Sequence, residues 1–200
     1  GATEGLKADK GRLKRFVSSK KDIFSKIKKL EVELGTYMVG DLAVNNDSLV
    51  VYITPNPRNM GKASIKIAMD VLKHIYNDKI PDNPISLGYN AVQTHGIEVF
   101  TDVDVDFTPL GKTKDRTELL NSILLLTDEF INRNALSVVE TNGGFHILIK
   151  KCMVDKAYSK KWYTGFRKMK NEDFETTMNG DNMIPLPGCN QGGYTPKLLD

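Results

Sequence analysis

The hydrophobic pattern of this chain is clearest at residues 97–107, where apolar and polar side chains alternate. Because successive side chains of a β-strand point to opposite faces of a sheet, this alternation predicts a strand with one apolar face. That face is formed by the odd positions Ile97, Val99, Val103, Val105 and Phe107. The other face carries the even positions Glu98, Phe100, Asp102, Asp104 and Asp106. The pattern therefore predicts a core strand with three aspartates in a row on one side.

Periodic spacing of apolar residues predicts further helices and strands. Apolar positions three and four residues apart are typical of helices with one apolar face. Helices are predicted at or within residues 10–33, 62–77, 115–132 and 156–169. Short apolar runs bounded by turn residues predict strands at residues 35–39, 48–54, 136–140 and 145–150. This order predicts an α+β domain with helices packed on a mainly antiparallel sheet.

Turn residues indicate how these elements are connected. The strands at 35–39 and 48–54 are joined around Asn45-Asn46-Asp47, so we expect them to form a hairpin. Residues 78–94 predict a polar connection, and the Gly-, Pro- and Asn-rich tail from Met178 predicts loops. We expect residues 1–34 to form a basic N-terminal helical segment and residues 35–200 to form one compact unit.

Charge is distributed unevenly, although the formal net charge is only +3. Residues 1–30 carry ten Lys or Arg and three acids, and residues 150–170 carry eight and one. Residues 78–108 hold six acids and one Lys. Basic flanks around an acidic centre suit a polyanion that is held at its edges while cations occupy the middle. The alternative for each basic segment is a solvated, lysine-rich helix face.

The composition, 40% hydrophobic and 26% charged, is typical of a globular domain. No apolar run approaches 18 residues and the N-terminus lacks a signal peptide, so no membrane partner is expected. Cys152 and Cys189 have no zinc-ligand spacing and form no disulfide framework, which predicts a reducing, cytoplasmic location. Because the first residue is Gly, we expect a piece of a longer protein.

The three aspartates can share a cation only as neighbours. Alternate strand residues lie roughly 6.6–7 Å apart, close enough for two carboxylates to reach one ion, whereas Asp102 and Asp106 would lie about 13 Å apart. Like charges so close repel one another unless cations lie between them. Because the apolar Phe100 leads up to Asp102, we favour Asp102 and Asp104 as the pair that shares a cation, with Asp106 outside this pair. The alternatives are an Asp104–Asp106 pair, an exposed edge strand and a calcium-binding turn.

A second candidate site follows residue 140, where Gly143-Gly144 precedes a predicted strand. Paired glycines let backbone amides approach a phosphate without a Cβ in the way. On the strand, His146, Leu148 and Lys150 share one face, while the residues between them point into the core. An imidazole and an ammonium beside a glycine turn suit an anion site. The alternative is a hairpin with a hydrogen-bonded structural histidine.

Two loops carry further polar candidates. Asn56-Pro57-Arg58 is a stiff turn whose amide and guanidinium suit phosphate or template contact, or it is an ordinary surface turn. Residues 179–197 are too rich in Gly, Pro and Asn to pack a core, and their short apolar stretch at 183–186 favours an ordered loop. This loop contains an isolated acid, Asp181.

Together these segments resemble the catalytic core of the archaeo-eukaryotic primase superfamily, the primase-polymerases of viral and plasmid type. Residues 99–104, ending in Asp102-Val103-Asp104, are similar to the first motif of that family. Residues 143–149, with His146, are similar to the second, and Asp181 ahead of residues 184–193 is similar to the third. Residues 52–62 resemble a segment of viral and plasmid-type members. The hydroxyl residue before the histidine is displaced here to Thr141, and Asp181 follows a Gly rather than a hydrophobic strand.

The resemblance implies an RRM-like palm that catalyses template-directed nucleotidyl transfer, with residues 35–200 as the catalytic domain. It implies that Asp102, Asp104 and Asp181 hold two Mg²⁺ or Mn²⁺ ions, which clamp the attacking 3′-oxygen and the leaving pyrophosphate. It also implies that the incoming nucleotide is bound by a larger set of residues: His146, Gly143, Gly144, Thr141, Lys150, Arg58 and Lys112. The partners that it implies are a single-stranded DNA template, nucleoside triphosphates and a replicative helicase, in phage or plasmid replication.

The residues themselves leave two other functions open. A metal-dependent nuclease or another phosphotransferase would use the same pair of aspartates. A noncatalytic nucleic-acid-binding module with an RRM-like sheet is the other alternative. A row of aspartates would repel a phosphate backbone, and only Phe100 offers an aromatic ring on the acidic face. The pattern therefore favours an enzyme over a binding module.

Overall fold

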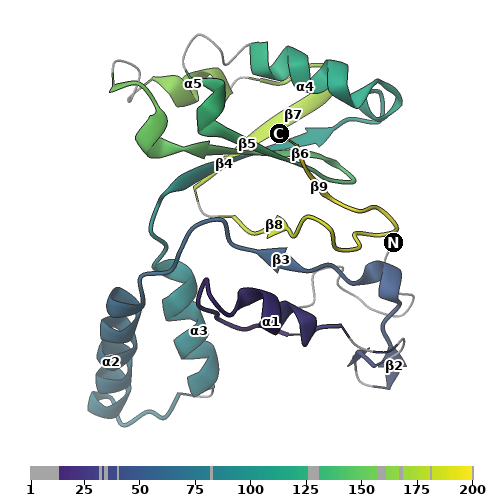
Figure 1. Ribbon diagram of the computed structural model, residues 1–200. Coiled ribbons are helices and arrows are strands. Elements are labelled where there is room, and N and C mark those ends of the chain that lie inside the picture. Colours follow the sequence, from purple (N-terminus) through teal and green to yellow (C-terminus); the bar gives the residue numbers. More distant parts are fainter. Residues whose placement is uncertain are drawn as a thin grey trace.

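A five-stranded antiparallel sheet is the largest element of the computed structural model, which describes residues 14–31, 33, 36–39, 41–81, 83–125, 131–156, 161–166, 169–180 and 182–199. Its order is β7-β4-β6-β5-β9. The strands are β4 (Phe100–Phe107), β5 (Leu136–Glu140), β6 (Gly144–Lys150), β7 (Phe174–Asn179) and β9 (Lys197–Leu199). Helices α4 (Arg116–Leu125) and α5 (Trp162–Phe166) lie over one face of this sheet (Figure 1). The predicted α+β class with an antiparallel sheet is confirmed.

The main core lies between this sheet and the two helices. Strand β4 contributes Val103, Val105 and Phe107, as the alternation predicted. The other buried side chains come mainly from β6, α4 and α5: Phe145, Ile147, Ile149, Leu119, Ile123, Trp162 and Phe166. Burying each large apolar side chain contributes roughly 1.5–3 kcal/mol to stability. The helices thus cover one face of the sheet, and the aspartates of β4 lie on the opposite face.

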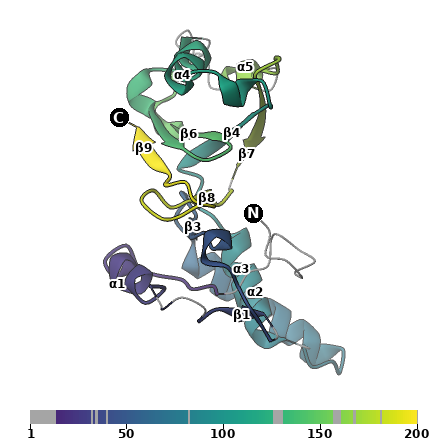
Figure 2. The ribbon, with the colours of Figure 1, turned by 90° about the vertical axis from the view of Figure 1, so that its right-hand side faces the viewer.

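The acidic face is turned towards a two-stranded ribbon formed by β3 (Tyr52–Ile53) and β8 (Ile184–Pro185) (Figures 1 and 2). A small apolar cluster of Val139, Leu148 and Ile184 joins the ribbon to the sheet. The predicted hairpin of residues 35–39 and 48–54 is therefore wrong. Strand β1 (Met38–Val39) pairs with β2 (Leu42–Ala43), and β3 pairs with a strand about 130 residues later. Turn residues indicate a chain reversal but do not identify the partner of a strand.

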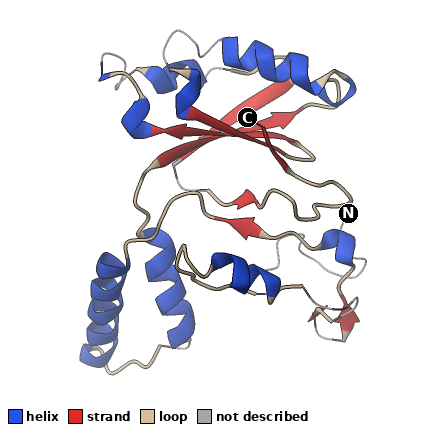
Figure 3. Ribbon diagram, viewed as in Figure 1, coloured by secondary structure: helices blue, strands red, loops and turns tan. Residues whose placement is uncertain are grey.

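Helices α2 (Met60–Tyr76) and α3 (Pro84–Thr94) lie side by side and project from the ribbon (Figure 3). Helix α2 was predicted from its periodicity, but its apolar stripe is exposed to solvent. The predicted connection at 78–94 is wrong, because α3 occupies most of it. Asn83 caps this helix, its Oδ1 accepting a hydrogen bond from Ser86 N at 2.9 Å, and Pro84 lies in the first turn, where no N–H is needed.

Several predicted helices fall partly outside the described residues. Of the helix predicted at 10–33, the described part contains only α1 (Ile23–Lys28), and residues 10–13 lie outside the described residues. Of the helix predicted at 115–132, α4 is described up to Leu125, and residues 126–130 lie outside the described residues. Of the helix predicted within 156–169, the structure describes α5, and residues 157–160 and 167–168 lie outside the described residues. The predicted loop-rich tail instead contains β8 and β9, and it begins within β7. The predicted domain boundary at 34/35 falls on residues that the structure does not describe.

No helix in the described part of the chain combines the length and the apolar character needed to cross a membrane.

Candidate active site

The three aspartates of β4 lie where three strands meet. Strand β4 is paired with β6 on one side and with β7 on the other. Asp104 lies directly across from His146 of β6, so the first and second candidate motifs face each other on one side of the sheet. Asp102 lies across from Asn179, the last residue of β7. Asp106 lies across from Gly144, at the opposite end of the row.

The imidazole of His146 is held between two carboxylates. Its Nδ1 lies 3.1 Å from Oδ2 and 3.2 Å from Oδ1 of Asp102, and 3.6 Å from Oδ1 of Asp104. A nitrogen that faces carboxylate oxygens carries the proton, so we assign an Nδ1–H that donates to Asp102. Asp102 is only 1% exposed, whereas Asp104 is partly exposed and Asp106 is exposed. A cation that enters from solvent therefore meets Asp104 and Asp106 before it meets Asp102.

This cluster changes the proton affinity of its members. Burial raises the pKa of Asp104 to about 6, helped by the negative charges of Asp106 and Asp102 and opposed by His146. Burial pushes the pKa of His146 down, but its hydrogen bond to Asp102 and the surrounding carboxylates outweigh this effect, so that the pKa is raised. The site thus holds excess negative charge that a proton or a metal cation can neutralise.

The turn before β6 requires a glycine at position 144. A Cβ on Gly144 would lie 1.8 Å from the carbonyl oxygen of Val105, so only glycine allows β6 to approach β4 here. Thr141 is buried and closes the turn, because its Oγ1 both donates to Gly144 O and accepts from Gly144 N at 3.2 Å. Gly143 has more space and lies beside Asp106. Of the three predicted phosphate contacts in this turn, Gly143 is thus the most open.

Arg116 is a functional candidate that the sequence analysis missed. Its guanidinium donates to the carbonyl oxygens of Thr141 and Asn142 at 2.7 and 3.1 Å, and to Glu140 Oε1 at 3.0 Å. Tyr194 donates to the same Glu140 oxygen at 2.6 Å, and burial together with this bond raises the pKa of Tyr194 to about 12. Arg116 therefore fixes the turn from the start of α4. Arg116 lies at the start of the helix predicted at 115–132, and a single arginine there carried no signal of a site.

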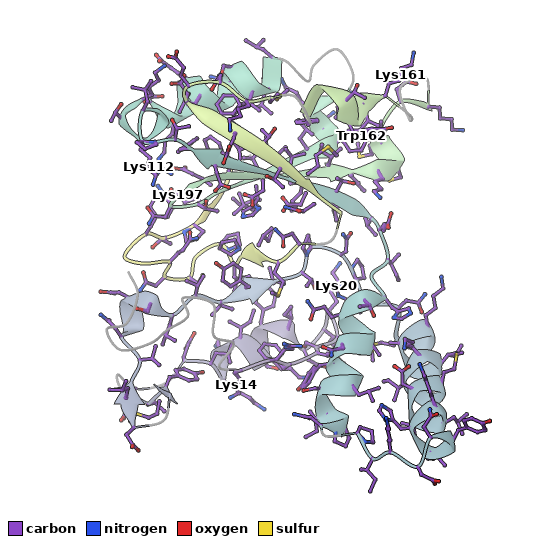
Figure 4. All side chains as sticks on the ribbon, turned by 180° about the vertical axis from the view of Figure 1, so that it is seen from behind. Lys14, Lys20, Lys112, Lys161, Trp162 and Lys197 are labelled. Carbon is purple, nitrogen blue, oxygen red and sulfur yellow. The ribbon has the colours of Figure 1, made fainter. Side chains whose placement is uncertain are left out.

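A cavity of about 270 Å³ lies beside this turn and is lined by Lys112, Arg116, Asn142 and Gly143. Lys112 and Gly143 were both predicted to contact the nucleotide, and the structure brings them together here. Lys197, which pairs with Glu140 of β5, and Lys112 both lie at the left edge of the molecule in the view of Figure 4. This end of the acidic row therefore carries positive charge.

Lys150 and Arg58 are not part of this arrangement. Lys150 ends β6 four residues beyond His146, roughly 13 Å away along the strand. Arg58 Nη1 donates to the carbonyl oxygen of Gln93 at 2.9 Å, at the base of the α2–α3 hairpin. The structure thus gives Arg58 a contact that holds the hairpin.

Asn56 has a structural role that connects the third motif to the first. Although buried, it donates through Nδ2 to Phe100 O at 3.0 Å and Gly180 O at 3.1 Å. Its Oδ1 accepts from the backbone N–H groups of Val99 and Phe100. The chain at Gly180 is therefore tied to the start of β4, at the end of the acidic row where Asp102 lies. Asp181 itself lies outside the described residues.

Residues 184–193 of the third motif lie over the acidic face of the sheet. Their strand β8 pairs with β3, and Gln191 Oε1 accepts from Asn142 N at 3.1 Å. On the ribbon, Tyr52 has a pKa that burial raises, with further contributions from the charges of Cys189 and Asp104. Tyr52 therefore lies opposite the acidic row, a position that the pairing of β3 with β8 creates and that sequence reasoning missed.

Carboxylate oxygens are the ligands that Mg²⁺ and Mn²⁺ prefer, so the chemistry of Asp102 and Asp104 fits such an ion. The described ranges, which omit Asp181, contain no group of three or more Asp, Glu, His or Cys side chains that could together hold a metal.

No protein-family model, no curated protein and no solved structure matches this chain. The likeness to primase-polymerases therefore rests on the motifs and on their arrangement.

Proposed function

We propose that this chain is the catalytic domain of a primase-polymerase, which joins nucleotides on a single-stranded DNA template. The observation that carries the proposal is the register of β4 and β6. It puts Asp104 directly across from His146, with Asp102 hydrogen-bonded to the same imidazole. The first and second motifs of the family are thus neighbours on the side of the sheet that faces the ribbon, while helices cover its other side.

The topology supports an RRM-like palm. The elements follow one another as β4, α4, β5, β6, α5 and β7, and the sheet order of their strands is β7-β4-β6-β5. A β-α-β-β-α-β unit with two helices on one face is the arrangement of ferredoxin-like and RRM sheets. In an RRM the two central strands contact nucleic acid, and here those strands carry the aspartates and His146. Strand β9 extends the sheet beyond this unit.

The carboxylates would hold the divalent cations. Asp104 is partly exposed and has a raised pKa, so a cation there would take the place of a proton. Asp102 is the neighbouring carboxylate on the same side of β4. Asp181 would be the third metal ligand, since the preceding residue, Gly180, is held at the start of β4 by Asn56. Bound Mg²⁺ or Mn²⁺ ions supply charge neutralisation at the attacking and leaving oxygens of an in-line displacement.

His146 and the basic cavity would bind the nucleotide. Because Nδ1 is held by Asp102, Nε2 is the ring nitrogen that would donate to a phosphate oxygen. Beyond Asp106, the cavity lined by Lys112, Arg116 and Gly143 offers cationic and backbone N–H groups for the distal phosphates. The row of acidic residues would thus run from the 3′-terminus of the growing strand to the triphosphate.

The test is incubation with single-stranded DNA, Mn²⁺ or Mg²⁺ and labelled nucleotides, with and without an annealed primer. Products that lengthen with template length support the proposal, and their dependence on a primer distinguishes extension from initiation. Degradation of the DNA without added nucleotides would favour a nuclease. DNA binding without nucleotide or cation affinity would favour a noncatalytic module, and either result contradicts the proposal.

A further inference from the structure

Helix α1 and the segment before it form an exposed basic surface. Residues 14–31 carry seven Lys or Arg and two acids. Six of the seven basic side chains are exposed: Lys14, Arg15, Lys20, Lys21, Lys28 and Lys29. The seventh, Lys26, donates from Nζ to the carbonyl oxygen of Val17 at 2.7 Å and holds the preceding segment against the helix. Clustered, exposed cationic groups of this kind attract polyanions.

Contacts with the rest of the molecule give this surface a defined position. Tyr89 of α3 donates to the carbonyl oxygen of Arg15 at 3.0 Å, and the Arg15 guanidinium lies 5.5 Å from the centre of the same ring. Ile23, Ile27 and Leu30 are partly buried, so the apolar side of α1 is turned towards the protein. The helix lies on the side of the ribbon away from the sheet (Figures 1 and 2).

An aromatic ring lies in the middle of this basic surface. Phe24 is 77% exposed, although Phe is among the side chains most often buried. Lys28 follows it by four residues, so the two side chains are neighbours on one face of α1. Lys20 and Lys21 lie in the turn that leads into the helix. A solvated lysine face needs no such ring, whereas single-stranded nucleic acid binds both to cations along its backbone and to rings that stack on its bases.

We propose that residues 14–29 form a second contact surface for single-stranded DNA. The exposed lysines contact its phosphates, and Phe24 stacks on an unpaired base. The inference rests on the proposed function for the identity of the strand, which is the template, and it adds a contact outside the acidic row. Because the carboxylates of that row repel phosphates, cationic groups elsewhere on the molecule have to hold the strand. Duplex DNA offers phosphates without an unpaired base, so it contacts the lysines alone.

The other polyanion that a basic helix can contact is the surface of an anionic membrane. That contact requires an apolar helix face that enters the lipid. In α1 the isoleucines are turned towards the protein, and Phe24 is the one large apolar side chain of this helix that is exposed. A single ring suffices to stack on a base but buries little apolar area in a lipid. The side chains of α1 therefore favour nucleic acid.

The test is the binding of a fluorescein-labelled oligothymidine of about 20 nucleotides, followed by fluorescence anisotropy from about 50 to 300 mM NaCl with EDTA and without nucleotides. Lys21→Ala combined with Lys28→Ala should raise the dissociation constant at least about tenfold. It should also reduce the salt slope by about 1.4, since two phosphate contacts at about 0.7 each are lost. Phe24→Ala should raise the dissociation constant about 5- to 150-fold and leave the salt slope unchanged.

Matched variants separate these contacts from general effects of charge and folding. Lys62→Ala combined with Lys73→Ala removes two exposed lysines from α2, which α3 separates from α1 (Figures 1 and 2). This control should bind within about twofold of the wild type, because charges beyond a Debye length are screened. Phe24→Tyr should bind like the wild type and Phe24→Leu like Phe24→Ala, since stacking needs a ring. All variants should keep the wild-type circular dichroism spectrum, because the changed side chains are exposed.

Wild-type affinity of both the double lysine variant and Phe24→Ala would overturn the proposal, and so would equal weakening by the control pair. A wild type that does not bind the oligonucleotide would overturn it too, and binding to phosphatidylserine vesicles would then identify an anionic membrane as the partner. A wild type whose DNA binding depends on Lys21, Lys28 and Phe24 but which extends no primer would contradict the proposed function and still support this surface.

Discussion

Two regions of this molecule depart from the usual distribution of polar and apolar side chains, and they do so in opposite ways. The acidic side of β4 buries charge, with Asp102 and His146 almost fully enclosed. Helix α2 exposes apolar side chains along its whole length. Burying unneutralised charge and exposing a large apolar patch both cost free energy. Each region therefore carries a cost in free energy, the first from buried charge and the second from exposed apolar surface.

The largest expected contrast between core and helix comes from truncating one aliphatic side chain in each. Ile147→Ala should reduce the free energy of unfolding by about 2–5 kcal/mol, because Ile147 of β6 is fully buried between the sheet and the helices. Leu72→Ala should change it by less than about 0.5 kcal/mol in dilute protein, because Leu72 is 65% exposed on α2. Urea denaturation of both variants at submicromolar protein concentration measures these changes in the free energy of unfolding. Similar losses for the two variants would contradict the exposed placement of α2.

Glycine substitutions give the next contrast. Gly144→Ala should destabilise the protein by about 1–3 kcal/mol, because the new Cβ meets the backbone of Val105 and forces β6 away from β4. Gly88→Ala is the control, since a Cβ there meets no atom within 4 Å and alanine favours the α3 helix by about 0.5–1 kcal/mol. Thermal melts of the two variants should move in opposite directions. A neutral Gly144→Ala would show that β6 can shift without cost.

A smaller, stabilising effect is expected at the acidic row. The pKa of Asp104 is about 6 in the folded, metal-free protein and 3.8 as a reference for the unfolded chain, so the folded state binds this proton more tightly. The stability that this group contributes is therefore present at low pH and is lost as pH rises from about 4 to 6. Asp104→Asn should then stabilise the metal-free protein at pH 7.5 by about 1–2 kcal/mol after allowance for solvent screening.

The pH dependence checks the cause of this effect. The difference between Asp104→Asn and the wild type should shrink as pH falls through 6 and approach zero below the unfolded pKa of 3.8, where Asp104 is neutral in the folded and the unfolded chain. Mn²⁺ should raise the melting temperature of the wild type and not of the variant, since only the wild type offers the carboxylate. A variant that is less stable than the metal-free wild type at pH 7.5 would contradict the picture of an uncompensated acidic site.

Local patterns predicted the elements that build the main core. Alternation predicted which residues of β4 and β6 face the helices and which face the site, because strand periodicity is imposed by the backbone. Helix α2 was also evident from its periodicity. The same pattern could not show that its apolar face stays exposed, since a hydrophobic stripe is the same in sequence whether the chain covers it or not.

Long-range pairing explains most of what the sequence could not predict. Strands β3 and β8 have two residues each and are about 130 residues apart, so neither has a periodic signal that identifies its partner. Tyr52 and Gln191 reach the site only through that pairing. Asn56 was read as a phosphate contact or a surface turn, but its hydrogen bonds to Phe100 and Gly180 show how the turn holds two motifs together. Helix α3 was missed because Asn83-Pro84 was interpreted as a loop instead of a helix start.

The most direct test of the central claim, that the acidic row catalyses nucleotidyl transfer, is template-directed incorporation by three proteins measured side by side. Wild type and Asp41→Asn, a control that changes an exposed aspartate in the β1–β2 turn, should extend a primed DNA template with Mn²⁺ present. Asp104→Asn should lose at least about 10³-fold in rate while keeping the wild-type circular dichroism spectrum. Incorporation by Asp104→Asn at the wild-type rate, or by none of the three proteins, would contradict the account.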